Sequence, residues 1–277
     1  MATPSTIPQE RTSAPDGRTL HRLAGRGALR GFTNLFANEN HGWWRTRAWI
    51  VQFAVWLGII NGLIALVTYG ETQDPSGMMP PLLQTLIQVF FKAGGPAIAV
   101  GAVIAAQGAV VGEKQLGTAA WIMSKPAGRS AFLLAKLAAY LLVFVGLAIA
   151  VPSVVFFGQT RLAAGQTPAL LPFLAAQGVM LLHLLFYLAL TLLLGAFASS
   201  RGPVAGGALG FLFAGMLLPS FVPQVAVVFP WQLGDIAAGL ALGTRLPATW
   251  PIPVAATAVW TLLFIAAALW RFAREEF

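Results

Sequence analysis

Residues 172–198 read PFLAAQGVMLLHLLFYLALTLLLGAFA, a run without a single Asp, Glu, Lys or Arg. A helix that crosses the bilayer hydrocarbon needs about 20 largely apolar residues, and this run is long enough. The rest of the chain has the same character, because 57% of its 277 residues are hydrophobic and only 9% are charged. Soluble domains carry about 25% charged residues. The composition therefore predicts an all-α membrane protein.

Five further apolar segments are long enough to cross the membrane. The six expected spans are residues 48–69, 91–111, 131–157, 172–198, 204–229 and 251–270, which make residues 48–277 a six-span transmembrane domain. Gly94, Gly95 and Pro96 should break or bend the long apolar segment that begins at Leu82, so a separate amphipathic piece at residues 82–91 is expected before the second span. Pro152 should interrupt the third span in the same way.

The segments outside the spans differ in character. Residues 1–30 are rich in Pro, Ser, Thr, Gly and Arg, and this composition predicts a disordered basic cytoplasmic tail. Residues 31–47 combine Phe and Trp with polar and basic residues, which indicates an interfacial amphipathic helix. Residues 230–250 include an apolar stretch, 233–242, that is too short to cross, so we expect a re-entrant or interfacial hairpin between spans five and six.

Lys and Arg are unevenly distributed between the two sides of this arrangement. One side holds fourteen of them: Arg11, Arg18, Arg22, Arg26, Arg30, Arg45, Arg47, Lys114, Lys125, Arg129, Lys136, Arg201, Arg271 and Arg274. The other side holds Arg161 and Arg245, with Lys92 near its boundary. Cytoplasmic loops are enriched in Lys and Arg, so both termini should be cytoplasmic. The same rule explains the net charge of +8 better than nucleic-acid binding does.

The longest expected cytoplasmic loop, residues 112–130, reads GEKQLGTAAWIMSKPAGRS. Leu116, Ala119, Ala120 and Met123 recur at helical spacing. Pro126 ends the pattern, because the residue before a proline is disfavoured in a helix. The loop therefore predicts a short helix that lies against the inner membrane surface or against a soluble partner.

This loop resembles that of the permease subunits of the ABC-2 family of ABC transporters. In that family the second span ends in Gly/Ser-Glu, followed by Gly-Thr, an apolar helix, a Pro, a basic residue and a Lys in the third span. The matching residues are Gly112, Glu113, Gly117, Thr118, Pro126, Arg129 and Lys136. The interfacial helix, the six spans and the outer hairpin are also similar. The interfacial segment departs from the family, since it lacks the common Lys-Glu pair there.

The resemblance implies a transport subunit, an exporter component of the bacterial inner membrane, without its own ATPase site. It would act as a dimer with a second permease subunit, identical or related, among membrane lipids. A separate ATP-binding cassette ATPase would bind ATP and Mg and dock on the coupling helix between spans two and three. The residues implied in this ATPase-coupling interface are Glu113, Gly117, Thr118, Trp121, Lys125, Pro126, Arg129 and Arg201. The resemblance implies no catalytic, cofactor or metal site in this chain.

Four polar residues within or beside the spans are candidates for pathway lining or for packing: Lys92, Gln107, Gln177 and His183. Ionisable groups in hydrocarbon are costly and often mark transport pathways. Lys92 could instead extend to the outer interface, and His183 could make a helix-to-helix hydrogen bond. Asp235 in the outer hairpin could be a cap or a gate.

Two other function classes remain as alternatives. An ion-coupled secondary transporter would place ionisable groups or broken helices near mid-membrane, and Gly94-Gly95-Pro96 could be such a break. A polytopic membrane enzyme would need clustered acids, bases or nucleophiles, and only Lys92 and His183 lie within or beside the spans, on different segments.

Cysteine chemistry is excluded, because the chain has no cysteine. Residues 108–114 lack the spacing of a phosphate-binding loop, so ATP binding by this chain is not expected.

Overall fold

The computed structural model describes residues 27–73, 81–124 and 127–275, and within these ranges the regular structure is helical throughout. Six helical segments are long and apolar enough to cross a membrane: Ala48–Glu71, Leu82–Gln115, Arg129–Ala164, Leu170–Phe197, Arg201–Phe221 and Pro251–Ala273. The prediction of an all-α chain with six spans is confirmed. Residues 1–26 of the expected tail lie outside the described residues.

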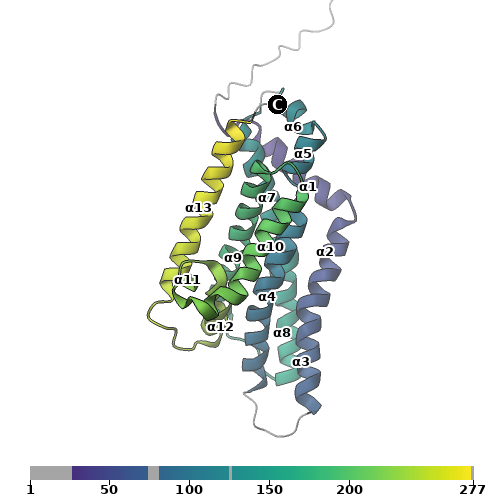
Figure 1. The fold of residues 1–277 in the computed structure, drawn as a ribbon. Coiled ribbons are helices and arrows are strands. Elements are labelled where there is room, and N and C mark those ends of the chain that lie inside the picture. The colour runs from purple at the N-terminus through teal and green to yellow at the C-terminus, as the bar shows by residue number, and fades with distance from the viewer. Residues whose placement is uncertain (1–26, 74–80, 125–126, 276–277) are drawn as a thin grey trace, which may run out of the picture.

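Short turns and π-helical stretches divide these segments into smaller elements, and Figure 1 labels the α-helices among them. In chain order they are α1 (Phe32–Arg45), α2 (Ala48–Trp56), the π-helical η1 (Leu57–Asn61), α3 (Gly62–Gln73), α4 (Leu82–Ala106), α5 (Val111–Gln115), α6 (Thr118–Met123), α7 (Arg129–Phe144), the π-helical η2 (Val145–Ala150), α8 (Val151–Ala164), α9 (Leu170–Phe197), α10 (Arg201–Phe221), α11 (Pro223–Ala226), the 3-10 turn η3 (Pro230–Gln232), α12 (Leu233–Leu242) and α13 (Pro251–Ala273).

The segment quoted first from the sequence, now α9, lies at the centre of the bundle. It contacts α4, α7, α10, α12 and α13. In its most apolar stretch 72% of the residues are buried, against 17% in α10 and 22% in α13. A helix that is apolar on every face is suited to this position, because every side can pack on a neighbour. The outer helices expose their apolar faces, as helices surrounded by lipid do.

The second span differs from the sequence expectation. α4 runs without interruption from Leu82 to Ala106 with Pro96 inside it, so the prediction of a separate amphipathic piece at residues 82–91 is wrong. The proline ring has no N–H, which leaves the carbonyl of Lys92 without its helical donor. Gly94 and Gly95 are buried against other helices, and this packing accommodates residues that weaken an isolated helix. The bend lies further along, at residues 107–110, where α4 gives way to α5.

π-helical turns occur in the first and third spans, and they explain how the third span continues through Pro152. The turn η2 precedes Pro152, which occupies the first turn of α8, where the missing N–H is tolerated. Asn61, at the end of η1, donates to the carbonyl of Pro152 at 3.1 Å and to the side chain of Gln159 at 2.9 Å. Gln159 donates back to the Asn61 carbonyl at 2.8 Å. These hydrogen bonds therefore join η1 of the first span to α8 of the third span.

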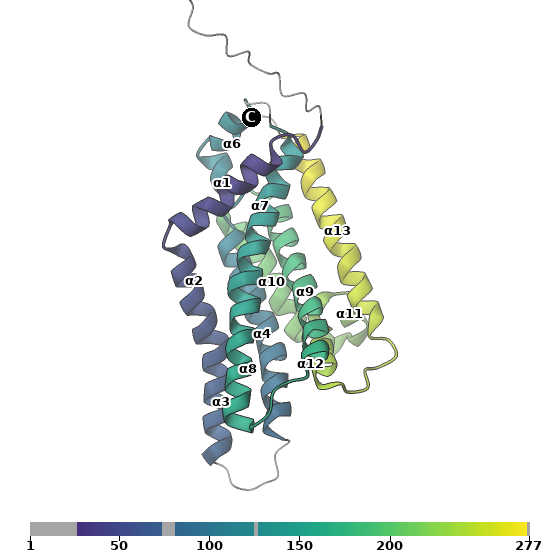
Figure 2. The same cartoon turned by 180° about the vertical axis from the view of Figure 1, so that it is seen from behind.

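The fifth span is shorter than expected, because α10 ends at Phe221 and not at residue 229. The chain then turns through α11 and η3 into α12, whose bounds coincide with the short apolar stretch found in the sequence. α12 packs on α4 and α9, so it belongs to the helix bundle. In both views α3, α4 and α8 extend beyond α11 and α12 (Figures 1 and 2).

One end of the bundle holds α1, α5, α6 and the C-terminal residues of α13 (Figure 1), and we call it the terminal end. α1 lies obliquely across α7 at this end (Figure 2), and the two helices are in contact. The sequence expectation that residues 31–47 form a helix is met by α1. Its interfacial position remains a prediction.

Candidate functional site

The loop between spans two and three forms an elbow of two short helices at the terminal end. The sequence predicts one helix from Leu116 to Met123, but α5 and α6 are separated at Gly117. Gly117 has φ +69°, a left-handed backbone that side-chain-bearing residues rarely adopt. Helical spacing of apolar residues cannot reveal this break. Lys125 and Pro126, predicted for the coupling interface, lie outside the described residues.

The elbow presents apolar surface at the terminal end. Leu116 is 78% exposed and Trp121 is 62% exposed, whereas Ala119 is buried. Exposed large apolar side chains are common on the lipid-facing spans, but these two lie beyond the spans. Large apolar side chains exposed outside the spans suit contact with another protein.

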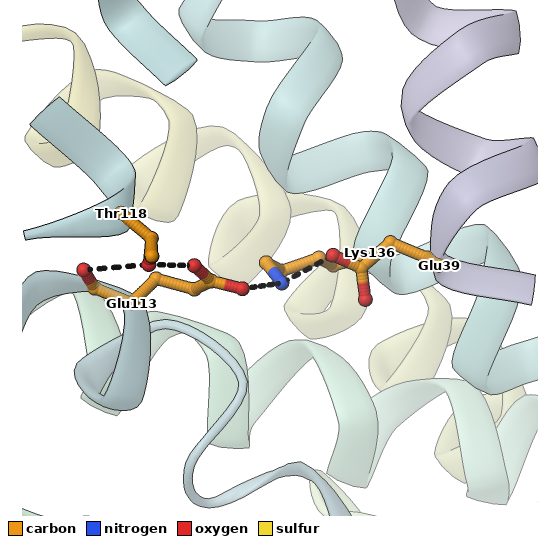
Figure 3. Close-up of polar contacts among 4 residues, drawn as sticks. All are labelled: Glu39, Glu113, Thr118 and Lys136. Carbon is orange, nitrogen blue, oxygen red and sulfur yellow. Dashed lines mark hydrogen bonds and ion pairs between the residues drawn. The ribbon is translucent and has the colours of Figure 1, made fainter. Parts of the chain in front are cut away.

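A polar network of four side chains holds the elbow to the bundle, and we call Glu39, Glu113, Thr118 and Lys136 the elbow network (Figure 3). Lys136 Nζ lies 2.5 Å from Glu39 Oε1 and 3.1 Å from Glu113 Oε1. The hydroxyl of Thr118 donates to the Glu113 carboxylate and lies 3.2 Å from the Glu113 carbonyl. The four residues come from α1, α5, α6 and α7.

Burial explains why the lysine has two acidic partners. The Lys136 side chain is only 3% exposed, and the side chains of Glu39 and Glu113 are 21% and 26% exposed. A buried ammonium loses its hydration, so it must be paired and hydrogen-bonded. The partial exposure of the carboxylates lets water solvate the extra negative charge. The network therefore fixes the elbow and α1 to the same point of α7.

An open hollow of about 370 Å³ lies beside the elbow network, between α1 and the beginning of α5. Glu39 and Glu113 both line it, together with Asn38 and Trp43. The Trp43 ring also makes an edge-on contact with Tyr140 of α7, with ring centroids 5.3 Å apart. A basic or polar side chain from another protein could reach the two carboxylates through this hollow.

The turn between α9 and α10 lies beside the elbow. Lys114 donates to the Ala196 carbonyl at 3.1 Å, and Gln115 donates to the Ser199 carbonyl at 2.8 Å. The guanidinium of Arg201 lies over the bend between α4 and α5, where a methyl group added to Gly108 would be 3.0 Å from Arg201 Nε. The structure thus brings Arg201 next to the elbow.

Arg129 binds the chain's own C-terminal segment. Its Nη1 donates to the carbonyls of Ala273 at 2.7 Å and Glu275 at 2.6 Å. The Glu275 carboxylate in turn pairs with Lys114 at 3.0 Å and with Arg271 at 2.5 Å. The predicted interface residue Arg129 therefore joins the beginning of α7 to the end of α13.

The four polar candidates of the spans lie in different surroundings. Gln107 donates to the Ile104 carbonyl of its own helix at 3.1 Å, and Gln177 donates to Ser153 at 2.8 Å. Lys92 pairs with Asp235 at 2.9 Å. His183 is 4% exposed and lines a cavity with that ion pair. Only Lys92 and His183 are thus brought together.

Sequence reasoning missed the acidic partners Glu39, Asp235 and Glu275. The signal was present for Glu39, because Lys136 lies six residues beyond the predicted end of the loop, within an apolar helix, and such a lysine requires a carboxylate nearby. Which carboxylate meets it depends on how α1 folds back over α7. Among the described residues, no group of three or more His, Asp or Glu side chains is placed to hold a metal ion.

Residues 82–277 match the family model described as ABC-2 family transporter protein. A search of curated proteins gives no match. The matched range includes α4 to α13, and therefore the elbow, Lys136 and the α9–α10 turn, whereas Glu39 precedes it. The range covers more than half of the chain and five of the six apolar helices found among the described residues, and these six helices make the chain a multi-pass membrane protein. The chain belongs to the ABC-2 family of transporter proteins, as a membrane-spanning component of an ABC transporter.

Proposed function

We propose that this chain is the permease subunit of an exporter and that a separate ATP-binding cassette ATPase docks on its elbow. The observation that carries the proposal is the elbow network. Lys136 joins the elbow to α7 and α1 through two short ion pairs, so a push on α5 and α6 reaches two further helices. The exposed Leu116 and Trp121 supply the apolar contact for the ATPase.

ATP and Mg²⁺ would be bound by the ATPase and not by this chain. Closure of the ATPase on ATP would move the elbow, and the elbow network would transmit that movement to the third span. The α9–α10 turn with Arg201 would form a smaller contact, because Lys114 and Gln115 hold it against α5.

The assembly proposed is a dimer of permease subunits, identical or related, in the bacterial inner membrane with both termini cytoplasmic. The uneven distribution of Lys and Arg supports this orientation. α10 supports the dimer, because it is the least buried span and exposes Gly206 and Gly210 at a spacing that permits close helix packing. Membrane lipid would cover the remaining apolar faces.

Copurification tests the docking proposal. The tagged chain, purified from its own host in mild detergent, should carry an ATP-binding cassette ATPase identified by mass spectrometry, together with ATP hydrolysis activity. The double variant Leu116→Ser/Trp121→Ala should lose most of both, since truncation of a central interface residue costs about 2 kcal/mol or more. The matched control is Leu162→Ser, which removes an 89% exposed leucine near the opposite end of the third span.

Two outcomes would contradict the proposal. In the first, the double variant retains the ATPase at the level of the Leu162→Ser control. In the second, the purified chain hydrolyses ATP in the absence of any copurified ATPase.

A further inference from the structure

A second polar site lies away from the terminal end, in a cavity of about 90 Å³ between α4, α9, α10 and α12. Its lining includes four polar or ionisable side chains, Lys92, His183, Trp231 and Asp235. A cavity needs about 10–15 Å³ of such space to admit one water molecule. This cavity is several times larger, so it has room for a compact polar group of several heavy atoms.

An ion pair stands at the opening of this cavity. Lys92 Nζ and Asp235 Oδ1 are 2.9 Å apart, and their side chains are 50% and 64% exposed. An ammonium has three N–H donors and a carboxylate has about four acceptor sites, so one mutual contact leaves both groups able to bind a ligand. Ionisable side chains at membrane depth often mark the path or the binding site of a substrate.

The interior of the cavity contains buried polar atoms without hydrogen-bond partners. Neither ring nitrogen of His183 has a partner in good hydrogen-bond geometry, and the backbone of Gly95 and Pro230 approaches the ring. The indole N–H of Trp231 also lacks an acceptor in hydrogen-bond geometry, and the Tyr187 hydroxyl lies near it. Native proteins leave few buried polar groups unsatisfied, because each one is costly.

Close packing fixes the position of the indole. A methyl group added to Gly215 of α10 would lie 2.3 Å from Trp231 Nε1 and 2.2 Å from its Cδ1. The absence of a side chain at Gly215 therefore lets the indole ring lie against α10. Trp231 and Lys92 line the same small cavity.

We propose that this cavity binds a zwitterionic group. Its anionic part would accept hydrogen bonds from Lys92 and Trp231, and its primary ammonium would donate to Asp235. An anion alone would be repelled by Asp235 and a cation alone by Lys92, whereas a group with both charges matches both. His183 would satisfy one further polar atom of the ligand. The inference does not rest on coupling to an ATPase, because binding needs only this chain.

Such a group has two sources, a phosphoethanolamine headgroup on a lipid or a free zwitterionic solute. The probes are dihexanoyl-phosphatidylethanolamine and free phosphoethanolamine, each titrated calorimetrically against the purified full-length chain in detergent. Binding of the lipid alone assigns the site to a lipid headgroup, and binding of both probes shows that the zwitterion suffices. Both results support the proposal.

The matched ligands are dihexanoyl-phosphatidylcholine and phosphocholine, which keep both charges but have no N–H on the cationic nitrogen. They should bind about tenfold more weakly, which corresponds to about 1.4 kcal/mol, because Asp235 loses its hydrogen-bond donor. Equal affinity for the ethanolamine and choline forms, or no binding of either ethanolamine probe at millimolar concentration, would overturn the proposal. This comparison uses the wild-type chain and so does not depend on how variants fold.

Variants locate the site. Lys92→Gln and Asp235→Asn should each weaken binding about tenfold, measured with whichever ethanolamine probe binds the wild type. Arg245→Gln, an exposed residue of the loop between α12 and α13, should bind like the wild type. Gel filtration establishes that each variant is folded before titration. If folded Lys92→Gln and Asp235→Asn both bind like the Arg245→Gln control, the ligand does not occupy this cavity and the proposal fails.

Discussion

Replacing Lys136 by methionine should destabilise the bundle strongly, because the substitution leaves two carboxylates without their shared cation. The lysine side chain is 3% exposed, so its ion pairs with Glu39 and Glu113 are shielded from water. Removing one partner of a buried ion pair costs about 3–5 kcal/mol. The side chains of Glu39 and Glu113 are 21% and 26% exposed, so water compensates in part for the lost cation, and we expect the lower end of this range, about 3 kcal/mol. At about 2–4 °C per kcal/mol this lowers Tm by roughly 6–12 °C.

A set of variants separates the effect of charge on Tm from the effect of packing. The triple variant Lys136→Met/Glu39→Gln/Glu113→Gln removes all three charges together, and it should recover more than half of the lost Tm, because replacing a whole buried ion pair by neutral groups is often close to neutral. Glu39→Gln alone should lower Tm less than Lys136→Met, since Glu113 still pairs with the lysine. Arg45→Met, at an exposed position of α1, should stay within about 0.5 kcal/mol of the wild type.

The assay is the loss of the monodisperse gel-filtration peak after heating the purified, detergent-solubilised chain through a series of temperatures. The reasoning is refuted if the triple variant is no more stable than Lys136→Met. It is also refuted if Lys136→Met and Arg45→Met shift Tm equally. Either result would mean that the elbow network does not hold α1 and the elbow to α7.

Two further predictions concern the same end of the bundle. Gly117→Ala should lower the free energy of unfolding by about 1–2 kcal/mol, because Gly117 has φ +69° and alanine is strained in that conformation. The same heating assay should show a lower Tm for this variant. The control Gly27→Ala, at an exposed glycine with open space around it, should change Tm little. Arg129→Gln should speed hydrogen–deuterium exchange at residues 271–275, because Arg129 binds the carbonyls of Ala273 and Glu275; unchanged exchange there would refute its role in holding the C-terminal segment.

The six spans could be predicted because the property that defines them is local. A run of apolar residues such as 172–198 must leave water whatever its neighbours are, so its length alone indicates a span. The same reasoning found α12 with its observed bounds, since a short apolar stretch between turns needs no long-range information. The motif around Glu113 and Thr118 was likewise readable, and the family match over residues 82–277 agrees with it.

Tertiary structure alone decided how these segments meet. α4 continues through Gly94, Gly95 and Pro96 because neighbouring helices bury that stretch, and local propensity does not contain this information. One partner of Lys136 is Glu39, 97 residues away in the chain, and Lys92 pairs with Asp235. Apolar burial depends on each segment's own composition, whereas ion pairs and cavities depend on which helices are adjacent. The sequence by itself therefore determined the membrane-spanning helices, and the packing of those helices determined the elbow network and the polar cavity.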